Sequence, residues 1–380
     1  YQDVYKTIYM KHILIDGTTI SRHMDGLSQY ILNVVLRLNV STARYTMLIR
    51  PGECPSGYLQ QIKARGISIE EVNIAPIGPL RDIQFARYLR SHQGFDAAFV
   101  PSNQYPLALR LPSVYVIHDV IYEQFPEQLG RFAVLKRWYL RLVVRNGLRR
   151  AKRVVTVSQY TRQEVEKCYG RQFASKIEVI YEGWEHLVKH VEGVQQRPQE
   201  VVFDEYILYV GSSRGHKNLS RLVAAIKLCQ NDLPKGLGFV IVGNTDMFTS
   251  EQMADIHQLN AIQPIIQLTG WLGDEQLDGY FRHAKALIFP SLSEGFGIPV
   301  LEAYFYKIPL LLSNQASLPE VAGDAAIYFN PYDINDIANT IVRFVKQDDY
   351  SELITRESKR LMLFGWQKTA DQLSNILQTI

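Results

Sequence analysis

Ala-Leu-Ile-Phe-Pro-Ser-Leu-Ser-Glu-Gly-Phe-Gly-Ile-Pro-Val-Leu-Glu, residues 286–302, is the stretch that decides the fold. The apolar run at its start, closed by proline and serine, is typical of a buried parallel strand. Gly295 and Gly297 then allow a sharp turn with exposed N–H groups, and Ile298 begins a predicted helix with proline in its first turn. Such a segment places free amides and the positive end of a helix dipole where an anionic ligand could bind.

Two carboxylates bracket this turn. Glu294 stands on the loop and Glu302 stands about one turn into the predicted helix. They are too far apart to share one proton, but they could hold two ends of a polar ligand. The alternative is a plain strand–turn–helix with two surface glutamates.

The same alternation of short β-branched runs and helical segments continues along the chain, which predicts parallel sheets covered on both faces. We expect strands at 11–16, 45–50, 67–74, 95–100, 113–118, 153–157 and 177–181, and then at 206–211, 238–243, 265–268, 286–290, 309–312 and 326–329. The predicted fold class is therefore α/β, with two doubly wound, Rossmann-like domains. Ligands of such sheets bind beyond the carboxyl ends of the strands, here in a central cleft.

Polar residues with proline and glycine at 189–200 form the predicted linker. Residues 1–188 are the predicted first domain, 201–364 the predicted second domain, and 365–380 a closing helix. Met10 looks like a natural beginning, so we expect residues 1–9 to be an extension, and we expect no signal peptide.

Composition restricts the classes of protein that this chain could belong to. At 380 residues two domains are expected, and 47% apolar with 21% charged residues is ordinary for a soluble globular protein. A net charge of +3 gives no general attraction to nucleic acid. Three cysteines without CxxC spacing argue against a disulfide framework or zinc site. No apolar run reaches about 18 residues, so we expect a cytoplasmic protein without a membrane span.

The Glu-x7-Glu pattern after a buried strand resembles the nucleotide-sugar signature of GT4-type retaining glycosyltransferases, which have the GT-B fold. Ser317-Leu-Pro-Glu-Val-Ala-Gly-Asp-Ala-Ala326 downstream is similar to bacterial polysaccharide mannosyl- and glucosyltransferases in particular. The resemblance implies that Glu302 binds the donor ribose, that the closing helix returns to the first domain, and that the donor sugar is held by Glu294, Gly295, Phe296 and Gly297. It places further donor-binding residues at Gly26, Gly211, Gly243, Leu272 and Leu301.

Val114-Tyr-Val-Ile-His118-Asp119 predicts a strand that ends in a histidine and an aspartate. Aspartate can orient a neutral imidazole, and histidine titrates near the working pH. The alternative is a buried histidine at a strand end. The continuation to Phe125-Pro126-Glu127 resembles a His-Asp…Phe-Pro-Glu segment of the family. This implies that His118 contacts the donor sugar, at its 6-hydroxyl or through the backbone, and helps stabilise the transition state.

Arg214 and Lys217 follow the predicted strand that ends at Gly211 and precede a predicted helix. Fixed positive charges there suit a diphosphate, because they neutralise it as it leaves. The spacing resembles the Gly…Arg…Lys-Asn pattern of the family, so both are predicted leaving-group residues; otherwise they are two exposed basic residues on a turn. No Asp-x-Asp motif occurs, so we expect no metal and no other cofactor.

Other loops carry weaker signals. Gly26 closes the first loop, which the resemblance places across the cleft from the donor. Asp25 replaces the first of the two adjacent glycines of the family, and a plain strand–helix turn is an equal alternative. For Trp271, stacking on the base and packing beneath it are both open. Ser158 is predicted to be a helix N-cap and nothing more. Glu182 replaces an asparagine of the family and receives no role.

Residues 131–153 contain nine basic and no acidic residues, with Arg137, Arg141, Arg145 and Arg149 in one stripe. We expect Trp138, Leu142 and Val143 to face inward. Peripheral contact with an anionic membrane, at its inner face, and a solvated surface whose arginine stems cover apolar groups remain equal alternatives.

Together these features predict a retaining glycosyltransferase that moves a hexose from a nucleotide diphosphate sugar, with UDP-sugar favoured and GDP-mannose as the other donor. The expected acceptor is a saccharide or lipid-linked saccharide in polysaccharide biosynthesis, and no nucleic-acid partner is expected. The alternatives are a non-catalytic nucleotide-sugar-binding protein and a sugar epimerase of the same fold. A dinucleotide-dependent oxidoreductase is disfavoured, because no GxGxxG follows the first strand.

Overall fold

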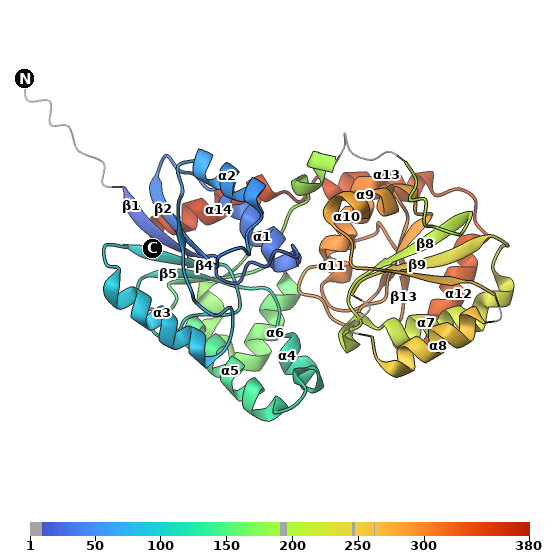
Figure 1. Cartoon of the computed structure of the whole chain (residues 1–380), viewed down its shortest axis with the longest axis horizontal. Helices are drawn as coiled ribbons and strands as arrows, with labels where there is room; N and C mark the ends of the chain where they lie inside the picture. The colour runs from blue at the N-terminus through green and yellow to red at the C-terminus, as the bar shows by residue number, and fades with distance from the viewer. Residues whose placement is uncertain (1–9, 191–195, 245–247, 262) are drawn as a thin grey trace, which may run out of the picture.

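The computed structural model describes residues 10–190, 196–244, 248–261 and 263–380, and Figure 1 shows them as two lobes side by side. Each lobe contains one parallel sheet with helices on both faces. The predicted extension, residues 1–9, and residues 191–195 of the predicted linker lie outside the described residues.

The first sheet has seven strands in the order β3-β2-β1-β4-β5-β6-β7, all paired in parallel. Its strands are β1 (Lys11–Asp16), β2 (Ala43–Ile49), β3 (Ser68–Glu71), β4 (Ala97–Val100), β5 (Ser113–Ile117), β6 (Arg153–Thr156) and β7 (Ile177–Val179). In Figure 1 one face carries α1 (Gly26–Val35), α2 (Ser56–Ala64) and α14 (Trp366–Thr379). The other face carries α3 (Pro79–Ser91), α5 (Ala133–Arg150) and α6 (Gln159–Tyr169), with α4 (Ile121–Gln124) and the 3-10 helix η1 (Pro126–Leu129) beside them.

The second sheet has six parallel strands in the order β10-β9-β8-β11-β12-β13. Its strands are β8 (Glu205–Val210), β9 (Leu237–Val242), β10 (Ile266–Gly270), β11 (Ala286–Phe289), β12 (Leu310–Ser313) and β13 (Ile327–Phe329). Its helices are α7 (Leu219–Cys229), α8 (Ser250–Asn260), α9 (Asp274–His283), α10 (Ile298–Tyr306), α11 (Leu318–Ala322), α12 (Ile334–Val345) and α13 (Ser351–Leu361). Further 3-10 turns are η2 (Arg171–Lys176), η3 (Glu185–His190), η4 (Gly215–Lys217) and η5 (Gln230–Asp232).

The predicted fold class is confirmed, and each of the thirteen predicted strands has a counterpart among the described residues. The central strands were predictable because parallel strands covered on both faces are apolar throughout. In β11, for example, Leu287, Ile288 and Phe289 are all fully buried. The largest difference is at the sheet edge, where β3 ends at Glu71 rather than at residue 74.

The chain passes between the lobes near residues 181–186 and again near 364–369. Glu185 accepts a hydrogen bond from the backbone N–H of Trp366, and Thr369 Oγ1 donates to the carbonyl of Tyr181; both are 2.6 Å long. A side chain at Gly183 would overlap the backbone of Trp366, so glycine is required at this crossing. Beyond it, α14 packs on α1 and β5 of the first lobe.

Helix α5 differs from its prediction. Val143 faces inward as expected, but Trp138 is 63% and Leu142 41% exposed, so the prediction for these two side chains was wrong. The buried side of the helix consists of Val143, Val144 and Leu148, and Trp138 and Leu142 lie on the opposite side. The stripe of Arg137, Arg141, Arg145 and Arg149 therefore shares the exposed side of the helix with apolar side chains. In the ranges described here, no helix is long and apolar enough to cross a membrane.

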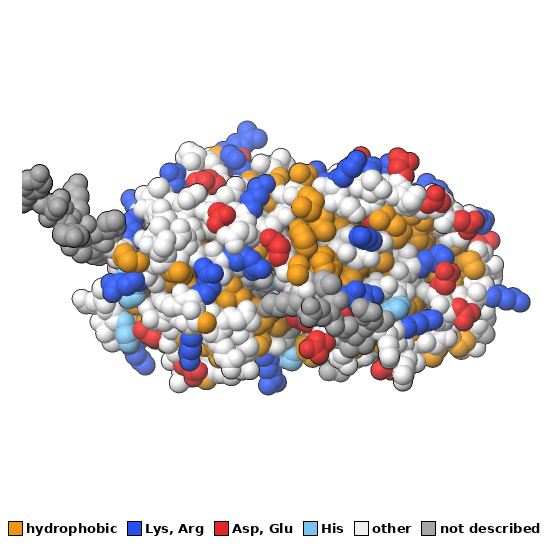
Figure 2. All heavy atoms as spheres, turned by 90° about the horizontal axis from the view of Figure 1, so that it is seen from above, with side chains coloured by type: hydrophobic (Ala, Val, Ile, Leu, Met, Phe, Trp, Pro, Cys, Tyr) orange, Lys and Arg blue, Asp and Glu red, His pale blue; other side chains and the backbone are white. Residues whose placement is uncertain are grey.

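The opposite side of the molecule has a different surface. Figure 2 shows that hydrophobic side chains gather along the middle of this face, where the two lobes meet, with charged side chains of both signs scattered around them. At the crossing, the ring of Trp184 lies 5.6 Å from the ring of Phe305 in α10. Apolar packing therefore joins the two lobes near the point at which the chain passes between them.

Candidate active site

Loops at the carboxyl ends of the second sheet bring two predicted site residues into contact. Glu294 lies on the loop after β11, and Lys217 ends the turn after β8. Lys217 Nζ is 2.7 Å from Glu294 Oε1, and the two side chains are only 19% and 11% exposed. Reduced solvent screening makes such a pair stronger than a surface ion pair.

The turn at 294–297 is fixed by its packing. A Cβ atom at Gly295 would overlap the carbonyl oxygen of His118 in the first lobe, so only glycine fits. Gly297 has φ of +103°, a conformation that favours glycine. Ser317 Oγ hydrogen-bonds the carbonyls of Glu294 and Phe296 at 3.0 and 2.9 Å. Ser317 therefore fixes two carbonyl groups of this turn. Among the described residues, no side chain forms a capping hydrogen bond with the first turn of α10.

The backbone segments that follow β8 and β9 are in close contact with each other. A side chain at Gly243, after β9, would overlap the carbonyl oxygen of Gly211, after β8. Both predicted donor-binding glycines, Gly211 and Gly243, therefore lie next to each other at the carboxyl ends of the strands. Leu272, after β10, is half-buried, and Trp271 is 54% exposed with its ring 5.3 Å from that of His23 in the first lobe.

His118 follows β5 with both ring nitrogens engaged. Nε2 is 2.9 Å from the carbonyl oxygen of Pro101, and Nδ1 is 3.4 Å from Glu182 Oε1. A carbonyl only accepts, so Nε2 carries hydrogen, while Nδ1 faces the Glu182 carboxyl. Burial alone would lower the pKa of His118, but the hydrogen bond and charge of Glu182 raise the pKa above its ordinary value.

The orienting carboxylate is thus Glu182 rather than Asp119. Asp119 Oδ1 accepts the backbone N–H of Ile121 at 3.1 Å and so belongs to the start of α4. Burial raises the pKa of Asp119, against the lowering effects of His118 and of the exposed Arg214. Arg214 therefore stands within electrostatic reach of the same site. Glu182 had no signal in the sequence, since its partner lies far away along the chain.

Glu302, in the second turn of α10, has a strongly perturbed carboxyl. Burial and the charge of Asp274 raise the pKa of Glu302 to about 7, although Lys217 acts in the opposite direction. Leu301 beside it is fully buried, so its side chain belongs to the core and only its backbone could meet a ligand.

The first loop is fixed around Gly26. Asp25 caps α1 by accepting from the Ser28 backbone N–H at 2.9 Å, which explains an aspartate at this position. A Cβ atom built on Gly26 would be 3.7 Å from Ile298 Cδ1, so Gly26 faces the start of α10 across the lobes. The buried Arg81 forms an ion pair with Asp16 at the end of β1, and this pair fixes the point at which the first loop begins.

Direct contacts between the lobes were missed from the sequence. Ser158 caps α6 as predicted, through Thr161 N at 2.9 Å, but its hydroxyl also donates to the carbonyl of Gly295 at 2.6 Å. Glu320 of α11 reaches the same helix end and accepts from Gln159 N and Tyr160 N at 2.7 and 3.0 Å. The start of α6 is therefore held by both lobes.

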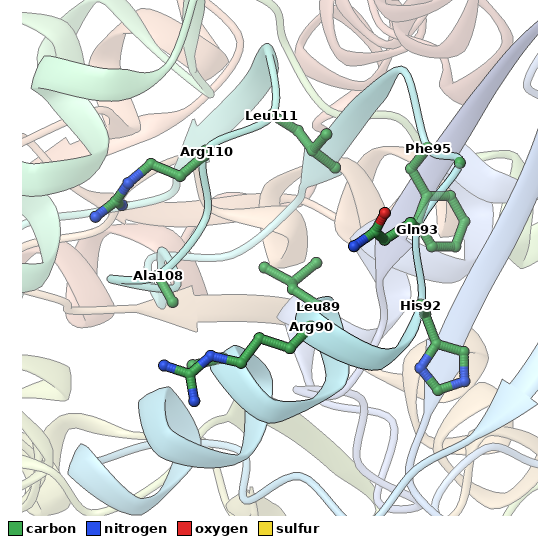
Figure 3. A pocket seen from close by; sticks show the side chains of 10 residues that line it. Leu89, Arg90, His92, Gln93, Phe95, Ala108, Arg110 and Leu111 are labelled. Carbon is green, nitrogen blue, oxygen red and sulfur yellow. The ribbon is translucent and has the colours of Figure 1, made fainter.

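A separate hollow of about 430 Å³ lies between the end of α3 and the segments that precede β4 and β5 (Figure 3). Leu89, Phe95 and Leu111 line it, with Arg90 and Arg110 at one side. It lies at the amino ends of the strands, whereas the residues described above follow the carboxyl ends. It is therefore not part of the candidate active site.

Comparisons with known families and proteins agree with this geometry. The family model Glycosyltransferase Family 4 matches residues 24–185, and the model Glycosyl transferases group 1 matches residues 194–361. O-antigen chain mannosyltransferase B of Escherichia coli is 26% identical over 268 residues, which are 69% of each chain. The serotype-specific mannosyltransferase WbdA of Escherichia coli is 27% identical over 81% of this chain, which spans only 37% of WbdA.

Solved structures confirm the predicted GT-B fold. HepE from Anabaena, solved with UDP and glucose, superposes with a TM-score of 0.71 at 16% identity, over 98% of this chain and 100% of that chain. WaaG, a glycosyltransferase involved in lipopolysaccharide biosynthesis, gives a TM-score of 0.69 at 14% identity, over 96% of this chain and 99% of that one.

Proposed function

We propose that this chain, which belongs to the GT4-type glycosyltransferases of the GT-B fold, moves a hexose with retention from a nucleotide diphosphate sugar to a saccharide or lipid-linked saccharide in polysaccharide biosynthesis. The observation that carries the proposal is the contact of Lys217 with Glu294 beside the turn at 294–297. A cation, a carboxylate and the backbone amides of a glycine-containing turn are groups that can hold a diphosphate and a sugar.

The ion pair suggests how the donor is received. In the structure Lys217 neutralises Glu294. A bound diphosphate carries more negative charge than one carboxylate, so Lys217 would turn to it, with Arg214 on the same turn. Glu294 would then be free to accept hydrogen bonds from sugar hydroxyls. Donor binding would thus replace the Lys217–Glu294 ion pair by a contact of Lys217 with the diphosphate and a contact of Glu294 with the sugar.

Glu302 is assigned to the ribose. An ionised carboxylate accepts hydrogen bonds from two neighbouring hydroxyl groups, whereas a protonated one accepts fewer. Because the pKa of Glu302 is raised to about 7, donor binding would supply the hydroxyl groups that stabilise its charged form.

The chemical step uses charge rather than a covalent enzyme intermediate. The bond from the anomeric carbon to the phosphate oxygen breaks, and the acceptor oxygen bonds to the same face of that carbon. The acceptor proton passes to the departing phosphate. Lys217, Arg214 and the backbone amides of the turn at 294–297 would stabilise the diphosphate. Protonated His118, held between the Pro101 carbonyl and Glu182, would add positive charge beside the sugar. These side chains take the place of a metal in the proposal.

Mannose is the favoured hexose because the relatives named above are mannosyltransferases. Both UDP- and GDP-linked donors enter the test. The full chain would be incubated with each donor and with a polysaccharide extract as acceptor, and free nucleotide would be measured. We expect acceptor-dependent release with one donor and an α-linked product. Binding without release would contradict transfer, and release of an altered sugar nucleotide would indicate an epimerase.

A further inference from the structure

Two glutamines of the first lobe contact loops of the second lobe, and neither is a predicted donor-binding residue. Gln124 is the last residue of α4, which lies at the side of the first lobe that faces the second (Figure 1), and Gln128 lies in η1. Ser293 Oγ donates a hydrogen bond of 2.6 Å to Gln124 Oε1, and Gln128 Oε1 lies 2.8 Å from His216 Nδ1. One segment of the first lobe, residues 121–129, therefore contacts both the loop after β11 and the turn after β8.

The side-chain amide of Gln124 is fixed in orientation by the first lobe. Its Nε2 donates to Tyr160 Oη at 2.7 Å and to Glu164 Oε2 at 2.9 Å. Tyr160 and Glu164 lie four residues apart on α6, so both face the same side of that helix. Because both amide hydrogens are engaged, Oε1 is left as the acceptor for Ser293, and turning the amide would break all three hydrogen bonds. Ser293 is buried, so the loss of this acceptor would be costly.

Gln128 and the ring of Phe125 hold His216 from the same segment. An amide oxygen only accepts, so His216 Nδ1 carries the hydrogen of the 2.8 Å contact with Gln128. Burial lowers the pKa of His216 to about 4, so the imidazole is neutral at pH 7 and the contact is a neutral hydrogen bond. The ring of Phe125 lies 6.2 Å from the imidazole. The turn that ends at Lys217 is therefore held from the first lobe by a directed contact and by an aromatic one.

The two loops that the glutamines contact carry the ion pair of the candidate active site. Ser293 directly precedes Glu294, and His216 directly precedes Lys217. The loops are also joined to each other, because Leu292 N donates to the carbonyl of His216 at 2.7 Å. A shift of either loop would therefore change the 2.7 Å contact between Lys217 Nζ and Glu294 Oε1.

The need to join the lobes does not by itself account for these contacts. The lobes already pack through apolar rings at the crossing, where Trp184 lies against Phe305. Neutral hydrogen bonds add little net stability, because they replace equivalent bonds to water, but they fix distances and directions. Hydrogen bonds that converge on the neighbours of Lys217 and Glu294 are thus suited to positioning those two side chains.

We propose that Gln124 and Gln128 are positioning residues, which set Glu294 and Lys217 from the first lobe in the geometry that receives the donor. The inference rests on the proposed function for the reaction that it serves. Gln124 acts through Glu294, and Gln128 acts through Lys217. The loss of either glutamine should lower turnover, because a small displacement of a charged group sharply reduces its effect on the transition state.

The first test measures kcat of acceptor-dependent nucleotide release by Gln124→Leu and Gln128→Leu. Leucine has a similar volume without hydrogen-bonding groups, so these half-buried positions stay packed. We expect each variant to lose at least about tenfold in kcat. Ser293→Ala removes the partner hydroxyl from the second lobe and should reproduce the loss seen in Gln124→Leu. Gln60→Leu, at an exposed position of α2 in the first lobe, should keep the wild-type kcat.

Double variants separate positioning from a general loss of structure. In the Lys217→Ala background, Gln128→Leu should cause no more than about a twofold further loss of kcat, because its effect passes through the missing lysine. Gln124→Leu should likewise add no more than about twofold to the loss in Glu294→Ala. A glutamine that only stabilised the fold would lower kcat by the same factor in every background. That result would overturn the proposal.

Hydrogen–deuterium exchange gives a second readout that needs no substrate. Both leucine variants should speed exchange in η4 and in residues 292–297 by at least about threefold, with exchange in β1 unchanged. Wild-type exchange rates in η4 and 292–297 would overturn the proposal even in an active enzyme. Faster exchange in a chain that transfers no sugar would support the positioning contacts and contradict the proposed function alone.

Discussion

Lys217 and Glu294 are the residues on which the candidate site depends most. They form a 2.7 Å ion pair, and the proposed function gives each of them a separate part in donor binding. The pair keeps two largely buried charges compensated, at a place where an unpaired charge would be costly.

Glu182 should tune His118, which gives a prediction on pH dependence. The charge and hydrogen bond of Glu182 raise the pKa of His118, so Glu182→Gln should lower that pKa. The protonated histidine would then be lost at lower pH, and the alkaline limb of the kcat profile should move down by about one pH unit or more. Glutamine has nearly the same size, so the fold should persist. An unchanged profile with unchanged kcat would exclude this role.

Glu302 should show a conflict between stability and donor binding. Its carboxyl has a pKa of about 7 in the folded chain against 4.5 for the free group, so the folded state holds the extra proton between these pH values. Stability from protonated Glu302 is therefore present at low pH and falls as pH rises through 7. Glu302→Gln, which stays neutral, should be more stable than wild type by roughly 1–3 kcal/mol at pH 8 and equal to it near pH 4.5.

The matched control is Glu357→Gln in α13, where burial raises the pKa of another carboxyl to about 8. Urea unfolding should show that Glu357→Gln, like Glu302→Gln, is more stable than wild type at pH 8 and equal to it near pH 4.5. Only Glu302→Gln should also raise the donor KM. If both variants kept the wild-type KM, the ribose assignment would be wrong.

At the scale of elements, the starts of α6 and α10 are where the two lobes meet. Ser158 and Glu320 bind the first turn of α6 from opposite lobes, and Gly295 lies on the carbonyl of His118. These contacts join the loop that carries Glu294 to the strand that carries His118. The geometry of the candidate site therefore depends on closure of the lobes.

Gly295→Ala tests this dependence. The added methyl group would overlap the His118 carbonyl, so the lobes should be held apart and kcat/KM should fall at least about tenfold. Small-angle scattering should report a larger radius of gyration. Gly57→Ala in α2, where a Cβ meets nothing within 4 Å, should change neither quantity. A closed, fully active Gly295→Ala enzyme would refute the dependence on closure.

Sequence patterns predicted the strands well but not the contacts between elements. Periodicity and apolar runs report what one segment buries, and this was enough for β11 and its turn. Glu182 and Glu320 act on partners brought near only by the fold, so neither had a local signal. Trp138 and Leu142 were wrongly placed inside because apolar side chains are usually buried, and this helix buries a different side.

The whole molecule combines a candidate donor site in the second lobe with residues of the first that close over it. His118 and Gly26 come from one lobe, while Glu294, Lys217 and Glu302 come from the other. The two lobes are joined at a tightly packed crossing, where Gly183 lies against the backbone of Trp366. Donor binding between them would favour the closed arrangement, because it adds contacts from both sides.

The central claim is that Lys217 stabilises a departing diphosphate, and the most direct measurement is acceptor-dependent nucleotide release by Lys217→Ala. We expect kcat to fall at least about a hundredfold with the fold intact by circular dichroism. Lys227→Ala, which removes an exposed lysine of α7, should keep wild-type turnover. Wild-type kcat in Lys217→Ala would contradict the account.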